Sequence, residues 1–334
     1  MRILNEAQVT ELLPMRACIE LMASALAALS RGDAQVPLRS VMRLPRGHDV
    51  LAVMPAHTGD PEVLGAKIIT VFPDNQSRGL DAHQGAVLLF HPRDGRLLAL
   101  LDASAVTAIR TAAVSGLATR LLARPDAGTL ALLGSGVQAR THLEAMAAVR
   151  QLRTVRVWSR TAAHAAAFAE WARAALGLEV MTCASAEEAV RGADIVCTVT
   201  SSREPVLEGA WLEPGTHVNA VGASQPDARE LDSDAVARAR LFADRRESLT
   251  HESADYQVPL REGRLRPDET VPELGEVVLG TVPGRRDADE ITLFKSLGLA
   301  IEDLVAAQHV LERAEREDVG TVVPMLGTAT SGAG

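Results

Sequence analysis

The segment "LALLGSGVQARTHLEAM", from Leu130 to Met146, places two glycines and a small residue between an apolar run and a helical pattern. Gly134, Gly136 and Ala139 form the pattern G-x-G-x-x-A. The first glycine permits a tight turn, the second lets the backbone approach a pyrophosphate, and the third small residue allows close helix–strand packing. The helix N-terminus then offers N–H groups to the phosphates. Because a strand-like run precedes the turn and further strand–helix units follow, the pattern predicts a dinucleotide site rather than a structural turn.

The end of the next predicted strand indicates which dinucleotide binds. An NAD site usually has Asp or Glu ~20 residues downstream, where the acid binds the ribose 2′-hydroxyl. Here the strand ends in "VRVWSRT", so Ser159, Arg160 and Thr161 occupy that place. A guanidinium forms bidentate, charge-assisted hydrogen bonds to phosphate. The residues therefore favour NADPH, with NADH as the other possible cofactor; the structural alternative is an exposed arginine that contacts no ligand.

Basic residues also occur in unusually apolar surroundings. Lys67 lies in "GAKIITVF", Arg39 in "PLRSVMR" and Arg110 in "TAIRTAAV". Together with His83 they suggest an anion pocket, in which two arginines bind a carboxylate and a lysine with a pKa lowered by burial donates a proton.

Each of these basic residues could instead have a purely structural role. Lys and Arg are rarely buried without a partner. They could pair with acids such as Asp81 or Asp102, or extend their charged ends to water. For any one of the residues taken alone, this interpretation has the same weight as the functional one.

The elements that position these residues follow from the apolar spacing. Residues 15–29 have helical periodicity, and short apolar runs punctuated by Pro, Gly, Asp and Asn continue to residue 102. Asp94 and Gly95 form a hairpin signal between two of these runs. From Ala103 a long helix of small residues leads into alternating strands and helices, which indicates a parallel sheet wrapped by helices. The predicted fold class is α/β, a Rossmann doubly wound parallel sheet plus a smaller α+β domain.

Composition excludes several other classes of protein. The 334 residues carry a net charge of −9, which argues against nonspecific nucleic-acid binding, and the charged fraction of 23% is ordinary for a globular protein. No run has the ~18 apolar residues needed to span a bilayer, and the N-terminal residues do not resemble a signal peptide. Cys18, Cys183 and Cys197 lack metal-ligand spacing and are predicted to be buried thiols. We expect a cytoplasmic protein that uses no metal.

The sequence resembles the ornithine cyclodeaminase/mu-crystallin family over nearly the whole chain. The resemblance is carried by "VMPA", "AHQGAVLLF", "LLDASAVTAIRTAAVSGLAT", "LGSGVQA", "NAVGASQPDARELD", "PELGEVV" and "FKSLGLAIED". It implies a homodimer. Residues 1–115 and 300–330 would form the substrate-binding and dimerisation domain, and residues 116–299 the NAD(P)-binding Rossmann domain.

The resemblance also assigns roles to individual residues. Lys67 matches a catalytic position, and Arg39 and Arg110 match positions around the substrate carboxylate. His57, in a family-like stretch, and Ser224 are further substrate-binding candidates. The positions implied to line the cofactor are Ala82, His83, Gly134, Ser135, Gly136, Val137, Gln138, Ser159, Arg160, Thr161, His164, Thr198, Val221, Lys295, Ser296 and Leu297.

One departure from the family pattern bears on the reaction. Cyclodeaminases and archaeal-type alanine dehydrogenases carry an essential Asp where this sequence has Ser224 in "NAVGAS". A deaminase needs a base that activates water, and serine without a partnering base does not supply one; Asp227 is three positions on and is a weak substitute. The "VGAS" version resembles the ketimine reductases.

The reaction predicted from this resemblance is NAD(P)H-dependent reduction of Δ1-pyrroline-2-carboxylate or Δ1-piperideine-2-carboxylate to L-proline or L-pipecolate. The alternatives are an ornithine cyclodeaminase, an alanine or other amino-acid dehydrogenase, and a non-catalytic protein that binds NADPH and a small ligand. The polar run from His251 to Tyr256 is interpreted as a surface loop rather than as part of the site.

Overall fold

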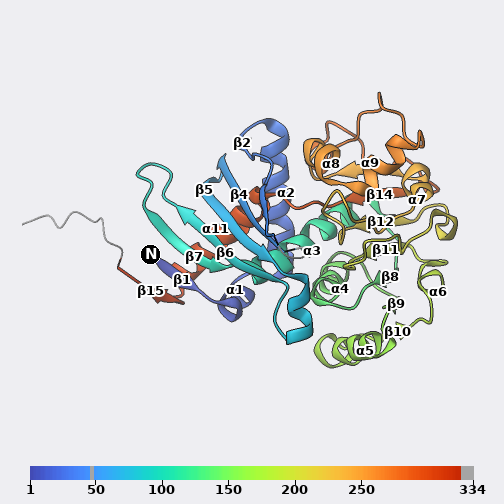
Figure 1. The fold of residues 1–334 in the computed structure, drawn as a ribbon, viewed down its shortest axis with the longest axis horizontal. Coiled ribbons are helices and arrows are strands. Elements are labelled where there is room, and N and C mark those ends of the chain that lie inside the picture. The colour runs from blue at the N-terminus through green and yellow to red at the C-terminus, as the bar shows by residue number, and fades with distance from the viewer. Residues whose placement is uncertain (46–48, 325–334) are drawn as a thin grey trace, which may run out of the picture. The chain divides into compact units, whose positions relative to one another are not determined.

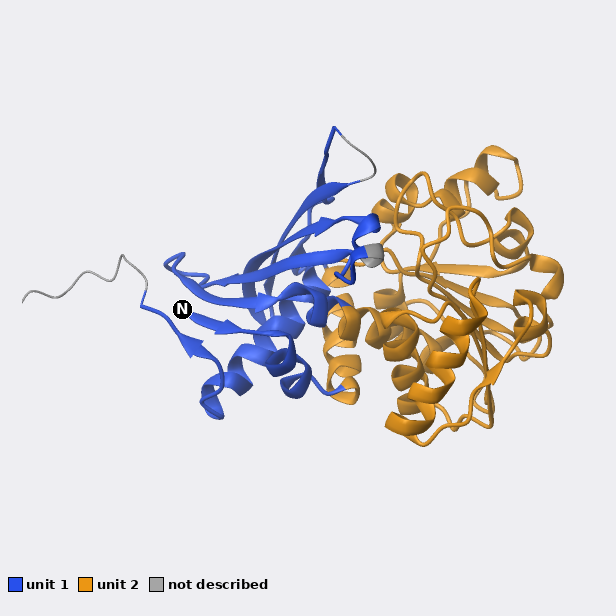
Figure 2. Cartoon of the chain, turned by 60° about the horizontal axis from the view of Figure 1, so that its bottom comes forward, with its two compact units in different colours: residues 1–14, 32–107, 300–334 blue, residues 15–31, 108–299 orange. Residues whose placement is uncertain are grey.

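The computed structural model describes residues 1–45 and 49–324, which separate into two compact units (Figure 2). Unit 1 contains residues 1–14, 32–107 and the chain from 300 onwards; unit 2 contains residues 15–31 and 108–299. These units differ from the predicted domain ranges at residues 15–31 and 108–115, which lie in unit 2. Residues 46–48 and 325–330 of the predicted first domain lie outside the described residues.

Unit 1 is built on an eight-stranded sheet with the order β15-β1-β7-β6-β5-β4-β2, in which β3 also pairs with β4 (Figure 1). The β1–β7 pair is parallel, and the other pairs are antiparallel. The predicted Asp94–Gly95 turn joins β6 to β7, and the Gly95 N–H donates to the His91 carbonyl at 2.9 Å. The elements are β1 (Arg2–Leu4), α1 (Glu6–Leu12), β2 (Ala34–Gln35), β3 (Ser40–Arg43), β4 (Val50–Gly59), β5 (Glu62–Val71), η1 (Pro73–Arg78), β6 (His83–Phe90), β7 (Leu97–Asp102), α11 (Ala300–Arg316) and β15 (Thr321–Val322).

Alternation along the strands gives this sheet two different faces. Met54 and Lys67 lie directly opposite each other on β4 and β5, and both are buried on the face that packs against α11. A Cβ on Gly65 would lie 2.8 Å from the Leu304 side chain, so glycine at this position lets α11 approach β5 closely. The opposite face carries half-buried apolar residues, among them Val53, Ala66, Ile68, Leu88 and Leu100.

Unit 2 is built on a seven-stranded, fully parallel sheet with the order β10-β9-β8-β11-β12-β14-β13 (Figure 1). The strand order reverses between β8 and β11, which makes this the switch point where doubly wound sheets bind ligands. The strands are β8 (Thr129–Leu133), β9 (Thr154–Trp158), β10 (Met181–Thr182), β11 (Ile195–Thr198), β12 (His217–Ala220), β13 (Arg240–Ala243) and β14 (Thr292–Lys295). The helices are α2 (Met15–Arg31), α3 (Ala103–Leu122), α4 (Val137–Val149), α5 (Ala162–Leu176), α6 (Ala186–Val190), η2 (Gly209–Trp211), α7 (Ser233–Arg238), α8 (Arg246–Glu252), α9 (Ala254–Arg261) and α10 (Leu274–Val278). The first residues of α3, 103–107, are counted with unit 1.

This architecture confirms the predicted α/β class with its parallel sheet. Helix α2 belongs with unit 2 because it packs against α4 and α10. Cys18 and Cys197 are buried as predicted, whereas Cys183 is only half-buried. Within the described chain, no single helix is both long and apolar enough to cross a bilayer, and α1 and α2 meet that test only jointly, as a bent pair.

Two buried histidines in unit 2 predict a loss of stability in acid. Burial lowers the pKa of His142 to about 4 and that of His217 to about 3. In the unfolded chain both take up a proton as the pH falls below about 6.5, whereas the folded chain keeps them neutral. Stability is therefore fully present above pH ~6.5 and declines toward pH 4 and pH 3, with a loss of about 2 kcal/mol per histidine already at pH 5.

Denaturant unfolding at pH 7.5 and pH 5 measures this loss. His142→Gln should lose about 2 kcal/mol less than the parent chain between the two pH values, because the titrating ring is gone. The exposed His251 offers a matched control, and His251→Gln should leave the pH dependence unchanged. Equal pH dependence in all three proteins would contradict the prediction.

Candidate functional site

The glycine turn has the geometry that a pyrophosphate site requires. Gly134, directly after β8, has a φ of +116°, and a Cβ there would lie 2.7 Å from the Val199 carbonyl. Gly136 caps α4 with no side-chain hydrogen bond, and a Cβ built on it meets nothing within 4 Å. Ala139, in the first turn of α4, is fully buried. The turn thus leaves open space at the helix N-terminus, where N–H groups bind phosphates.

The residues predicted for the adenosine side lie around the end of β9. The hydroxyl groups of Ser135 and Ser159 are 3.0 Å apart and join this strand end to the glycine turn. Arg160, Thr161 and His164 are exposed at the strand end and in the first turn of α5. Val137 is exposed and Gln138 half-buried at the start of α4. The structure therefore brings the predicted residues of this side together on one edge of the sheet.

Thr198 and Val221 meet at the carboxyl ends of β11 and β12. Thr198 is fully buried, and its carbonyl accepts the Val221 N–H at 3.0 Å. Ser224 follows in the next loop and is half-buried. The nearby Asp227 is exposed and forms an ion pair with Arg203 at 2.5 Å. A carboxylate held in this way is poorly suited to replace the acid that Ser224 lacks.

A buried carboxylate, Glu230, joins these strand ends, although no local pattern in the sequence marks it as a site residue. Its oxygens accept the Thr198 hydroxyl at 2.8 Å, the Thr200 N–H at 2.6 Å and hydroxyl at 2.7 Å, and the Gly222 N–H at 2.6 Å. Burial raises the pKa of Glu230, and the charge of Lys295 and these hydrogen bonds oppose the rise. Glu230 therefore fixes the loop between Val221 and Ser224 on the ends of β11 and β12.

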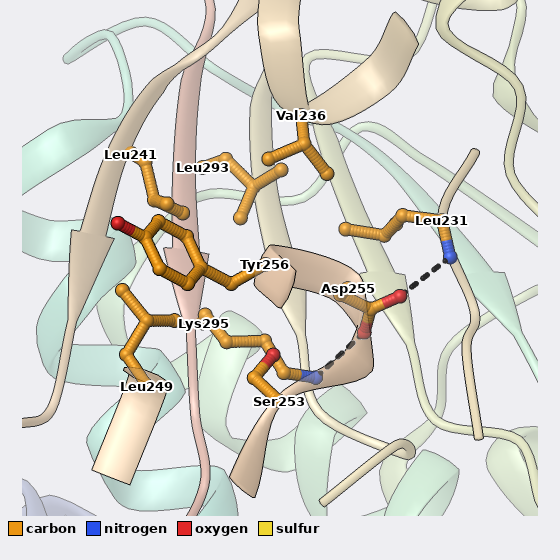
Figure 3. A pocket seen from close by; sticks show the side chains of 9 residues that line it. All are labelled: Leu231, Val236, Leu241, Leu249, Ser253, Asp255, Tyr256, Leu293 and Lys295. Atoms are coloured by element: carbon orange, nitrogen blue, oxygen red, sulfur yellow. Dashed lines mark hydrogen bonds and ion pairs between the residues drawn. The ribbon is translucent and has the colours of Figure 1, made fainter. Parts of the chain in front are cut away.

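Lys295, at the end of β14, lies in a second buried ion pair. Its ammonium is 3.0 Å from Asp255, which also accepts the backbone N–H of Leu231 at 3.1 Å (Figure 3). Asp255 is the second residue of α9 and is buried. The interpretation of His251 to Tyr256 as a surface loop was wrong, because these residues lie in α8, α9 and their junction, and the side chains of Asp255 and Tyr256 are buried.

The loop after β14 holds the remaining cofactor candidates and one substrate candidate. Ser296 and Leu297 are buried, and the Leu297 N–H donates to Asp244 at 2.5 Å. Arg110 is buried on α3, and a Cβ built on Gly298 would lie 2.7 Å from its guanidinium. Arg110 thus lies against the backbone of the same loop that carries Ser296 and Leu297.

In unit 1 the predicted catalytic lysine is buried in an ion pair. Lys67 is 1% exposed, and its ammonium is 3.0 Å from Asp303 on α11. The sequence suggested Asp81 or Asp102 as a partner for such a cation, whereas the ion pair in the structure is with Asp303. No local pattern could identify Asp303, because it lies 236 positions from Lys67. The chain contains two lysines, Lys67 and Lys295, and both are buried and ion-paired. Lysine differs from arginine in that its ammonium can be deprotonated inside a protein.

The other candidates of unit 1 divide into two groups. Arg39 is half-buried directly before β3, whose first residue, Ser40, pairs with Val53. One more step of this register would set Arg39 opposite Met54, which pairs with Lys67, and so about 10 Å from Lys67. Ala82 and His83 lie at the start of β6, and the exposed His83 accepts the Ser104 hydroxyl at its carbonyl. His57, in contrast, pairs with Leu64 and lies on the opposite face of the sheet from Lys67. The structure does not bring His57 together with Lys67 within one chain.

Among residues 1–45 and 49–324, no three His, Cys, Asp or Glu side chains are grouped as metal ligands. A dinucleotide fits the site, because the glycine turn, the open N-terminus of α4 and the polar end of β9 lie on one edge of the sheet. The residues that could hold it come from Gly134 to Gln138, from Ser159 to His164, and from the ends of β11, β12 and β14.

Comparison with known proteins gives near full-length matches. The model of the ornithine cyclodeaminase/mu-crystallin family matches residues 1–318. The ketimine reductase mu-crystallin of Mus musculus is 42% identical over 292 residues, which cover 86% of this chain and 89% of its own length. The structure of Thermococcus litoralis Δ1-pyrroline-2-carboxylate reductase in complex with NADH and L-proline has a TM-score of 0.94 and 39% identity, over 97% of this chain and 100% of its own. An archaeal alanine dehydrogenase dimer with bound NAD has a TM-score of 0.91 and 31% identity, over 98% and 99%.

Proposed function

The chain belongs to the ornithine cyclodeaminase/mu-crystallin family, and on this premise we propose that it is an NAD(P)H-dependent oxidoreductase that reduces a cyclic ketimine. The substrate is Δ1-pyrroline-2-carboxylate or Δ1-piperideine-2-carboxylate, and the product is L-proline or L-pipecolate. The observation that carries the proposal is the near full-length likeness to a reductase whose structure holds NADH and L-proline.

Each side chain in the proposal has a role that suits its chemistry. Arg39 and Arg110 bind the substrate carboxylate, because guanidinium groups pair with carboxylates in bidentate geometry. The Lys67 ammonium donates a hydrogen bond or a proton to the ring nitrogen and so keeps the imine cationic. A bound reduced nicotinamide supplies the hydride. Asp303 holds the Lys67 ammonium 3.0 Å away and limits its rotation.

Ser224 argues against the cyclodeaminase and dehydrogenase alternatives. Deamination needs a general base for water, and Ser224 replaces the acid that the resemblance expects at this position. Asp227 is exposed and paired with Arg203, so it does not fill the gap.

A spectrophotometric assay tests the proposal. The purified chain is offered NADPH with each of the two cyclic imines separately, and loss of the reduced nicotinamide absorbance is followed; NADH is run in parallel. Ornithine with NAD+ and alanine with NAD+ are the opposing assays. Imine-dependent oxidation is the expected result. Proline and ammonia from ornithine would establish a cyclodeaminase instead, and ligand binding without turnover in any assay would establish a non-catalytic binding protein.

The preference for NADPH is also proposed, on the basis of Arg160. Arg160 is exposed at the end of β9, where a dinucleotide-binding fold places the ribose 2′ position. Arg160→Ala should weaken NADPH binding by about 10–100-fold, the value of one or two charge-assisted hydrogen bonds, and change NADH binding much less. Titration of both cofactors measures the two dissociation constants. Arg173→Ala, at the exposed far end of α5, is the control; equal effects of Arg160→Ala on both cofactors would remove the assignment.

A homodimer is proposed from the open face of the sheet in unit 1. Val53, Ala66, Ile68, Leu88 and Leu100 form a half-buried apolar surface across β4 to β7. Contiguous apolar surfaces of this kind mark interfaces. The archaeal alanine dehydrogenase of the same fold is a dimer.

Substitution of Leu88 tests the proposed interface. Leu88→Glu should convert a dimer into a monomer of 35.4 kDa, because a carboxylate would be buried without a partner. Light scattering after size-exclusion chromatography measures the mass. Met181→Glu is the matched control, since Met181 is 60% exposed on β10 in unit 2. A parent chain that is already monomeric would overturn the proposal.

A further inference from the structure

The Glu230 carboxylate is bound in a way that suits its charged form. One oxygen accepts the Thr200 N–H and the other accepts the Gly222 N–H, both at 2.6 Å. Backbone N–H groups only donate, so a proton on either oxygen would compete with one of them. The hydroxyls of Thr198 and Thr200 add two further hydrogen bonds. These four hydrogen bonds and the Lys295 charge therefore favour the ionised carboxylate at the ends of β11 and β12, against the rise in the pKa of Glu230 that burial causes.

The surrounding charges do not cancel that charge completely. Asp255 pairs with Lys295 at 3.0 Å, and Lys295 also acts on Glu230. These two carboxylates and one ammonium are all buried and carry a net charge of about −1 when ionised. Figure 3 shows the Lys295 ammonium turned toward Asp255. A buried charge is screened far less than a surface charge, so it acts over several ångströms.

The buried charge of Glu230 lies at the strand ends over which the nicotinamide half of the proposed cofactor is expected to extend. The glycine turn ends β8, and the switch point separates β8 from β11. A dinucleotide held at this turn, with its adenosine half at Arg160 on the β9 side, extends its other half over the ends of β11 and β12. The nicotinamide ring is a cation when oxidised and neutral when reduced, so a nearby negative charge distinguishes the two forms.

We infer that Glu230 makes this chain bind the oxidised dinucleotide more tightly, relative to the reduced one, and thereby favours hydride donation to the substrate. The inference rests on the proposed function for the identity of the cofactor. Glu230 acts through its charge and through the loop it holds, and it is distinct from the residues assigned to the substrate.

The dissociation constants of NADP+ and NADPH, measured by calorimetry for the parent chain and for Glu230→Gln, test the inference; NAD+ and NADH are titrated in parallel. Glutamine keeps the size of the side chain and removes the charge. The ratio of the NADP+ constant to the NADPH constant should rise about tenfold in Glu230→Gln. A ratio that stays unchanged while the melting temperature falls would overturn the inference and leave Glu230 as a structural brace alone.

Asp194 provides a matched control in the same sheet. Its carboxylate also accepts two backbone N–H groups, from Gly128 and Thr129 at 2.9 Å, but at the amino end of β11, about 13 Å along the strand. Asp194→Asn should lower the melting temperature and leave the ratio unchanged. The same rise in both variants would overturn the inference, because it would reflect general loosening of unit 2.

A second variant covers the case in which Glu230→Gln does not fold. Asp255→Asn also removes one negative charge and leaves Lys295 to neutralise Glu230, so the ratio should again rise several-fold; no rise would overturn the inference. If the parent chain binds neither the oxidised nor the reduced dinucleotide, both the inference on Glu230 and the cofactor assignment are overturned. A parent chain that binds both forms and reduces no imine refutes the substrate alone, and the ratio still decides on Glu230.

Discussion

Lys67→Met is expected to lower kcat for imine reduction by about 10³-fold while NADPH binding stays within a few-fold of the parent. Positioned proton donors typically contribute about 10²–10⁴-fold, and methionine keeps the length of the side chain without an ionisable group. Lys67 lies in unit 1, whereas the glycine turn and the strand ends assigned to the cofactor lie in unit 2, so cofactor binding is expected to persist. Single-turnover measurements of hydride transfer and a fluorescence titration of NADPH give the two values.

Loss of activity in Lys67→Met has to be separated from loss of folding, because the substitution leaves the Asp303 carboxylate buried beside a methionine. Lys67→Met/Asp303→Asn removes both charges and should recover the melting temperature without recovering kcat. If the double variant or the single variant kept most of the parental rate, Lys67 would not be the proton donor.

The two lysines of the chain also allow a direct observation. A chain labelled with ¹³C-lysine should show two sets of side-chain signals, one from Lys67 and one from Lys295. Addition of L-proline should shift the set that disappears in Lys67→Met and leave the Lys295 set nearly in place. Shifts confined to Lys295 would contradict the assignment of Lys67 to the substrate.

The parts of the fold that local sequence determines were predictable. The glycine turn, the alternating strands and helices and the Asp94–Gly95 hairpin each depend on a few adjacent residues, and all were confirmed. Lys67 was conspicuous because a cation is unusual in an apolar strand. These signals depend on residue type and short spacing, which is why they can be read from one sequence.

The partners of those residues were not predictable in the same way. Asp303 and Lys67 are 236 positions apart, and Asp255 and Lys295 are 40 apart, so no local periodicity joins them. Asp255 lies in a polar run that is typical of a surface loop, and its burial depends on packing against β14 and the loop at Leu231. The scarcity of lysine was the available signal, since a chain that otherwise uses arginine keeps lysine at two buried, paired positions.

His57 shows how strand register limits a prediction based on neighbourhood in sequence. The turn between Gly59 and Glu62 pairs His57 with Leu64 and Met54 with Lys67. Directly paired residues share a face, and faces alternate along a strand, so His57 and Lys67 lie on opposite sides of the sheet. The length of the turn "GDPE" sets the register between β4 and β5. This register decides which residues of β4 share the face of Lys67.

The buried pair of Lys67 and Asp303 should show strong coupling in a double-mutant cycle of stability. Each single substitution, Lys67→Met or Asp303→Asn, leaves one charge of the pair in a buried site and should lower the free energy of unfolding by about 3–5 kcal/mol. The double substitution removes both charges and should cost less than either single one, because the desolvation penalty of both ions disappears with their attraction. Urea unfolding of the four proteins measures the coupling energy. The exposed pair of Arg173 and Glu179, with side chains 60% and 75% exposed, is the comparison cycle and should show much weaker coupling, because water and salt screen exposed charges. Additive effects in the buried cycle would mean that the pair contributes no more than its two separate side chains, and the positioning of Lys67 by Asp303 would lose its physical basis.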